Sequence, residues 1–166
     1  MARAKRPDCY EQLCGLAELC RAVLDAAGHR DAAACGRALR ELRLARGRYR
    51  DRLAREFIPP VGAGELMELA QALELIAWQA GRCAQSAPAS SPDPGVCAAA
   101  LGELFASLGS FHKSPAPLLA CDRLRALAAP ADSAASPRGP SAAAEGLCAA
   151  LWRLADAAER LILQNL

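Results

Sequence analysis

The sequence predicts an all-α protein, a bundle of about six helices arranged as two three-helix halves. Hydrophobic residues make up 53% of the 166 residues but aromatic residues only 4%, so Ala and Leu supply most of the apolar content and favour helix. The residue types that favour strands, among them Val, Ile and Thr, are scarce. Apolar residues recur at spacings of three and four along most of the chain, the pattern of helices that bury one face.

The first half of the chain is expected to hold three helices. The first covers 8–27, because Asp8 and Glu11 form a capping box and Gly28 suits the position after a helix end. The second begins after Asp31, a favourable N-cap residue, and continues to a pair of prolines. Its apolar positions lie close to a seven-residue repeat, as in coiled coils.

A helical hairpin over 50–84 is the clearest element of this half. Pro59 and Pro60 lack backbone donors and Pro59 disfavours the α region at Ile58, so the helix before them is expected to end near Phe57. Two amphipathic helices joined by a short loop are expected to lie antiparallel. The helix after the prolines, 65–84, is expected to bury Leu66, Leu69, Ala70, Leu73, Ile76, Ala77 and Ala80.

The second half follows a Pro- and Ser-rich linker at 86–95. Helices are expected over 96–111, over 118–129 and from Ser141 almost to the end, with a second linker at 130–140.

The domain organisation follows from these elements. The chain is expected to be a single helical domain over 1–166, with halves at 1–85 and 96–166 joined by the first linker.

Basic charge is concentrated on the helix before the prolines. Residues 37–56 carry eight arginines against three acidic residues, whereas the rest of the chain carries twelve positive and fifteen negative side chains. This concentration indicates a contact with an acidic partner, and the candidate contact residues are Arg37, Arg40, Arg43 and Arg46. The alternative is a solvated face whose long side chains cover apolar surface. No aromatic residues are interleaved to stack on bases, so no nucleic acid is expected.

Nothing in the sequence predicts catalysis, a cofactor or a metal site. The eight cysteines include no C-x-x-C spacing. Ser and Cys are plentiful, but His29 and His112 lie in expected loops with nothing that indicates a base held against a nucleophile. We interpret the cysteines as small buried hydrophobes in a reducing cytoplasm, although their even number leaves disulfides as the alternative. No uncharged apolar run reaches the length of about 18 residues that suggests a membrane span. The start of the chain lacks the apolar stretch of a secretory signal, so a cytoplasmic location is expected.

Two segments resemble a known family. Residues 53–60 read Leu-Ala-Arg-Glu-Phe-Ile-Pro-Pro and are followed by Glu65, Leu66, Leu69, Ala70, Leu73 and Glu74. The last helix adds Leu151, Asp156 and Glu159. These segments resemble the PhoU-like phosphate-transport regulators, in particular the accessory proteins encoded beside Pit-type phosphate transporters. The sequence departs from the family where Pro59 replaces a Thr and where Glu65 and Glu74 replace Asp.

The resemblance also implies where metal-binding residues have been lost. In the family, acids four residues apart on several helices bind metal ions on the bundle surface. These positions correspond here to Leu39 and Arg43, Glu74 and Trp78, Leu118 and Asp122, and Trp152 and Asp156. Every pair lacks at least one carboxylate, so the resemblance implies a metal-free member in which Arg43 pairs with Glu74 or Asp156. The tryptophans either occupy former ligand positions or are ordinary core residues.

The function that the resemblance implies is that of a non-enzymatic accessory or regulatory protein of inorganic phosphate transport. It would lie in the cytoplasm, peripheral to the inner face of the membrane, and dock on a Pit-type transporter through the arginine-rich face. The alternative is a helical protein-interaction module that associates with another copy of itself and has no connection with phosphate.

Overall fold

The computed structural model describes residues 9–55, 63–85, 92–108, 114–129 and 141–164. Within these ranges the chain forms six helices and no strand, so the predicted all-α class is confirmed. The helices are α1 (Cys9–Gly28), α2 (Ala32–Leu53), α3 (Ala63–Gln85), α4 (Pro94–Leu108), α5 (Ala116–Ala128) and α6 (Ala142–Gln164).

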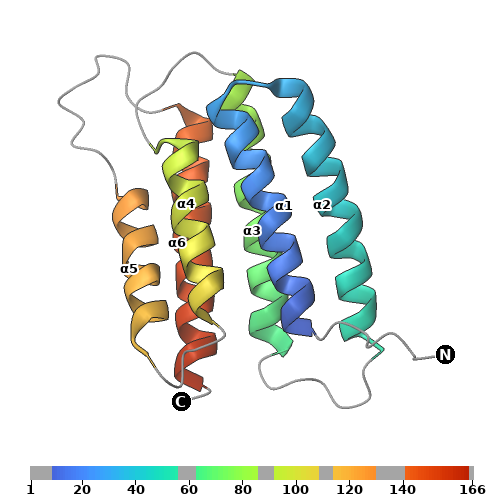
Figure 1. Ribbon diagram of the computed structural model, residues 1–166, viewed down its shortest axis with the longest axis vertical. Coiled ribbons are helices and arrows are strands. Elements are labelled where there is room, and N and C mark those ends of the chain that lie inside the picture. Colours follow the sequence, from blue (N-terminus) through green and yellow to red (C-terminus); the bar gives the residue numbers. More distant parts are fainter. Residues whose placement is uncertain (1–8, 56–62, 86–91, 109–113, 130–140, 165–166) are drawn as a thin grey trace.

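The six helices run up and down in two groups that meet along a central seam (Figure 1). In the first group α1, α2 and α3 pack on one another, and in the second α5 packs against both α4 and α6. The seam is formed by α1 against α4 and by α3 against α6. The helices α2 and α5 therefore lie at the two outer edges of the bundle.

One apolar core extends through both groups. The fully buried side chains are mostly leucines, and they come from all six helices: for example Leu13, Leu42, Leu73, Leu101, Leu124 and Leu147. All seven residues of the apolar stripe predicted on the third helix are buried, as the spacing of three and four requires. Burial of this stripe against neighbouring helices is what holds such Ala- and Leu-rich segments together.

Small residues let the helices approach closely at the seam. A Cβ atom on Gly146 of α6 would lie 2.3 Å from the amide nitrogen of Gln79, a buried side chain of α3. Likewise, the guanidinium of Arg21 on α1 lies over Gly102 of α4, 3.2 Å from where a Cβ would be. Glycine is therefore the residue that fits at both contacts, since any larger side chain would push its neighbour aside.

The boundaries of α2 and α4 differ from those predicted. The helix α2 ends at Leu53, four residues before the predicted Phe57, and its last turn tightens as the Arg55 N–H donates to the Arg52 carbonyl. The proline pair and Phe57 lie outside the described residues. The helix α4 starts at Pro94, inside the predicted linker, because proline suits the first position of a helix.

The turn between α1 and α2 also differs from expectation. Gly28 is the last residue of α1, and the left-handed backbone conformation falls instead on Arg30, whose φ is 58°. The predicted N-cap is confirmed, because the Asp31 carboxylate accepts the Ala34 N–H at 2.8 Å.

The described helices include none whose length and apolar character would let it cross a bilayer.

Candidate functional site

The four candidate arginines of α2 divide into two pairs. Arg37 and Arg40 are exposed, whereas Arg43 and Arg46 reach Glu74 on α3, with Nε to carboxylate distances of 3.2 Å and 2.5 Å. A spacing of three turns each successive residue about 60° around a helix, so these arginines rotate from the solvent side toward α3. We call Arg43, Arg46 and Glu74 the α2–α3 clamp. The predicted pairing of Arg43 with Glu74 is confirmed.

The solvent side of α2 carries an apolar residue among cations. Leu44 is 68% exposed, and Arg40 and Arg48 lie one turn before and after it, with Arg37 two turns before it. Among the described residues, no ion pair involves Arg37, Arg40 or Arg48. We call Arg37, Arg40, Leu44 and Arg48 the cationic face of α2.

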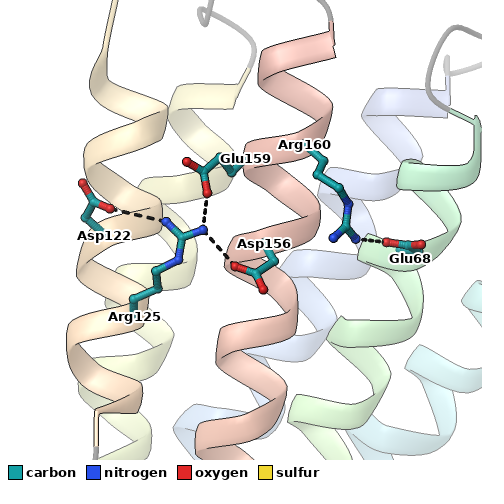
Figure 2. Close-up of polar contacts among 6 residues, drawn as sticks. All are labelled: Glu68, Asp122, Arg125, Asp156, Glu159 and Arg160. Carbon is teal, nitrogen blue, oxygen red and sulfur yellow. Dashed lines mark hydrogen bonds and ion pairs between the residues drawn. The ribbon is translucent and has the colours of Figure 1, made fainter.

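A second ion-pair cluster joins the other outer helix to its neighbour. Arg125 of α5 lies between Asp156 and Glu159 of α6 and is 2.8 Å from the Asp156 carboxylate (Figure 2). It also pairs with Asp122 on its own helix at 3.4 Å. We call Asp122, Arg125, Asp156 and Glu159 the α5–α6 clamp. The guanidinium of Arg125 contacts all three carboxylates of this clamp. The sequence did not indicate Arg125 as the partner of Asp156, for which only Arg43 had been expected.

The electrostatics of the α5–α6 clamp favour the ion pair. Hydrogen bonds to Asp156 and then Glu159 raise the pKa of the Arg125 guanidinium above its ordinary value, more than burial lowers it. The Arg125 side chain is only 20% exposed, so it is the most enclosed charged group in this cluster. The clamp is therefore a partly desolvated, charge-assisted contact that fixes α5 on α6.

Both tryptophans lie at the surface, which corrects the interpretation of them as core residues. Trp78 is 40% exposed and Trp152 is 44% exposed. The guanidinium of Arg82 lies 5.0 Å from the centre of the Trp78 ring, and that of Arg125 lies 5.5 Å from the Trp152 ring. Each ring thus stacks with a cation at the surface instead of filling the interior.

Several residues that the sequence resemblance predicted at metal-ligand positions lie at or beside these two clamps. Arg43 and Glu74 belong to the α2–α3 clamp, and Trp78 lies one turn beyond Glu74 on the same helix. Asp122 and Asp156 both contact Arg125, whose guanidinium also covers Trp152. Leu39 and Leu118 are half-buried on the outer helices. Arginine side chains therefore pair with the carboxylates at these positions, which are Glu74, Asp122 and Asp156.

The seam has one further ion pair and an open groove. Arg160 of α6 pairs with Glu68 of α3, as Figure 2 shows. These two residues, with Gln71, Leu75, Arg153 and Asp156, line a groove of about 330 Å³ between α3 and α6. A second groove of about 830 Å³ lies between α4 and α5 and is lined by four alanines, Leu119, Ser107 and three charged residues, Glu103, Asp122 and Arg123. In each groove the carboxylates are already engaged by arginines.

None of the eight cysteines, all of which lie in described helices, forms a disulfide, and most of them are buried. Burial, with a smaller effect of neighbouring Cys148, raises the pKa of Cys97 to about 12. Burial likewise raises the pKa of Cys121 to about 11 and that of Cys20 further still. The Cys20 thiol donates to the Leu73 carbonyl at 3.3 Å. Such groups behave as small apolar side chains and are poor nucleophiles at neutral pH.

Among the residues that the structure describes, no group of three or more His, Cys, Asp or Glu side chains is placed to hold a metal ion. His29 lies in the turn after α1, with its Nδ1 2.8 Å from the Asp25 carbonyl. His112 lies outside the described residues.

Comparisons with family models, with curated proteins and with solved structures found no match to this chain.

Proposed function

We propose that this protein is a non-enzymatic adaptor that binds an acidic surface of a partner protein through the cationic face of α2. The observation that carries the proposal is the arrangement of Arg37, Arg40 and Arg48 around the exposed Leu44. An apolar anchor surrounded by arginines is the composition that protein interfaces favour, because arginine both pairs with carboxylates and packs with its stem.

The rest of α2 supports this role by holding the face in place. Arg43 and Arg46 fix the helix on α3, and Tyr49 and Leu53 bury its inner side. The cationic face is therefore presented on a rigid outer helix and needs little ordering when a partner binds, which favours affinity.

The resemblance to PhoU-like regulators supports a specific partner, the cytoplasmic side of a Pit-type phosphate transporter. In this version of the function the protein regulates transport by docking and without a metal. The clamps support the metal-free part, because each puts arginine where uncompensated carboxylates would otherwise repel one another.

The experiment is co-purification of the purified chain with a detergent-solubilised Pit-type phosphate transporter. The double variant Arg37→Glu/Arg40→Glu should weaken binding by at least about tenfold, because like charges then face the partner. Arg43 and Arg46 are left unchanged, since their loss would disturb the contact with α3.

The control is Arg123→Glu/Arg153→Glu, which makes the same change in net charge at exposed sites on α5 and α6. It should bind like the unaltered protein. Undiminished binding of the α2 variant, or an equal loss in the control, would reject the cationic face as the contact. No binding of the unaltered protein would reject the transporter as the partner.

A further inference from the structure

The helix beside the cationic face carries an exposed acidic stripe. Glu11, Glu18 and Asp25 of α1 are exposed and lie seven residues apart, which places them along one side of the helix. Between them are the exposed small residues Gly15 and Ala22. A Cβ atom on Gly15 would meet nothing within 4 Å, so this side of α1 is open.

The two charged surfaces lie on antiparallel helices that pack side by side (Figure 1). Arg21 lies beside the acidic stripe on α1 and pairs with Glu18 at 2.9 Å. The cationic face of α2 has the opposite sign and carries the protruding Leu44. One half of the bundle thus presents both members of a complementary pair within one region of its surface.

We propose that these surfaces join two copies of the chain, with the cationic face of α2 in one copy lying on the acidic stripe of α1 in the other. A two-fold axis satisfies both contacts at once, because each copy contributes one surface of each sign. Leu44 then lies over Gly15 of the second copy, where the missing side chain leaves room for it. The two-fold axis keeps residues of equal height opposite each other, and the Cys35 thiol contact with the Val23 carbonyl sets that height, so Arg40 and Arg48 face Glu18 and Glu11.

The mixture of signs favours a second copy over an extended polyanion as the occupant of both surfaces, whereas a local acidic patch on a partner protein contacts α2 alone. A nucleic acid or an anionic membrane that approached α2 would also meet the carboxylates of α1 and be repelled by them. A second copy presents both signs in the matching arrangement. The inference does not rest on the proposed function, although self-association would cover the surface proposed for the partner, so the two forms of binding would compete.

The test is the molar mass of the purified chain in solution, measured by sedimentation velocity. We expect a dimer in about 0.1 M salt that dissociates in about 1 M salt, because the screening length falls from about 10 Å to about 3 Å. Two double variants reverse one surface each: Arg40→Glu/Arg48→Glu on α2 and Glu11→Lys/Glu18→Lys on α1. Each alone should dissociate at least about tenfold more readily than the unaltered chain.

Mixing the two variants is the decisive step, because the reversed α2 of one then complements the reversed α1 of the other. The mixture should form one-to-one dimers, a rescue that damaged folding would not give. Arg123→Glu on α5 serves as the control and should dimerise normally. A monomer in low salt, a dimer that both reversals leave intact, or a mixture that stays monomeric would overturn the proposal.

The outcome is separable from that of the proposed function. The variant Glu11→Lys/Glu18→Lys should lose self-association and still bind the transporter, since its cationic face of α2 is unchanged. Loss of transporter binding with an intact dimer would reject the proposed function alone.

Discussion

The two clamps hold the outer helices by opposite arrangements of charge. On the α2 side a single carboxylate, Glu74, receives two arginines, whereas on the α5 side a single guanidinium, Arg125, receives three carboxylates. The first cluster has an excess of positive charge and the second an excess of negative charge. Both connect an edge helix to the helix at the seam beside it.

This difference in charge arrangement determines how strongly the stability of each clamp depends on a single residue. Arg43 is half-exposed, so without Glu74 it can turn into water at little cost. Arg125 is mostly enclosed, and its removal leaves Asp156 and Glu159 close together without a cation. The α5–α6 clamp should therefore be the more sensitive of the two.

The largest effect is expected for Arg125→Gln. The free energy of unfolding should fall by about 1–3 kcal/mol, because removing one partner of a partly buried ion pair leaves the others unpaired. The lower part of this range allows for the exposure of the carboxylates. Chemical denaturation followed by circular dichroism provides the measurement.

Neutralising the carboxylates separates the ion pair from the packing of the arginine stem. In an Asp156→Asn/Glu159→Gln background, Arg125→Gln should cost clearly less than it does alone, since no anions are left unpaired. Arg123→Gln, at an exposed pair with Glu103, should change stability by less than about 0.5 kcal/mol. Equal costs in both backgrounds would mean that packing, not charge, explains the contact.

A smaller effect is expected for Glu74→Gln in the α2–α3 clamp. The loss should be about 0.5–1 kcal/mol, because the amide keeps a hydrogen-bond acceptor for Arg46 and the half-exposed Arg43 can turn into water. Glu41→Gln on the exposed side of α2 is the matched control and should leave stability unchanged. A loss at Glu74 that exceeds the loss at Arg125 would invert the comparison between the clamps.

The fold was largely predictable because one physical signal repeats along the chain. Spacings of three and four among Ala and Leu located all six helices, and the N-cap at Asp31 was found from its side-chain chemistry. The ends were less predictable. Pro59 limits where α2 can continue but does not make it continue that far, and the sequence alone did not indicate the left-handed conformation of Arg30.

The clamps were only half predictable, since they depend on which helices become neighbours. The pair of Arg43 with Glu74 followed from the two helices of one hairpin, whose adjacency was already expected. Arg125 instead meets residues more than 30 positions away in sequence, and its one local signal was Asp122 three residues before it. The sequence left open whether the tryptophans are core residues, because an apolar stripe and an exposed cation–π site share the same spacing.

The thiol of Cys121 reports on the charge of the α5–α6 clamp. Its pKa of about 11 is raised mainly by burial, while Arg125 lowers it and Glu159, Asp122 and Asp156 raise it. The exposed carboxylate of Asp122 can be removed with little disturbance, and Asp122→Asn should lower the pKa of Cys121. Alkylation at alkaline pH, followed by mass spectrometry of the Cys121 peptide, should then be faster than in the unaltered chain.

Glu41→Gln on α2 is again the control and should leave the alkylation of Cys121 unchanged. Unchanged or slower alkylation in Asp122→Asn would show that the excess negative charge of this clamp does not raise the pKa of the thiol. The same experiment on Cys35 of α2, whose pKa is raised mainly by burial and next by Asp31, should respond to neither substitution.

The smallest effect concerns the two tryptophans, which are coupled to their clamps differently. Trp152 shares Arg125 with the α5–α6 clamp, whereas Trp78 stacks with Arg82, which takes no part in the α2–α3 clamp. In a Trp152→Phe background, Arg82→Ala should change the fluorescence of Trp78 and lower stability by about 0.5–1 kcal/mol at most, the range for an exposed cation–π contact. In a Trp78→Phe background, Arg125→Gln should change the fluorescence of Trp152 together with the larger loss of stability. If Arg82→Ala destabilised the bundle as strongly as Arg125→Gln, the α2 side would depend on a third cation, and the asymmetry between the two edges would disappear.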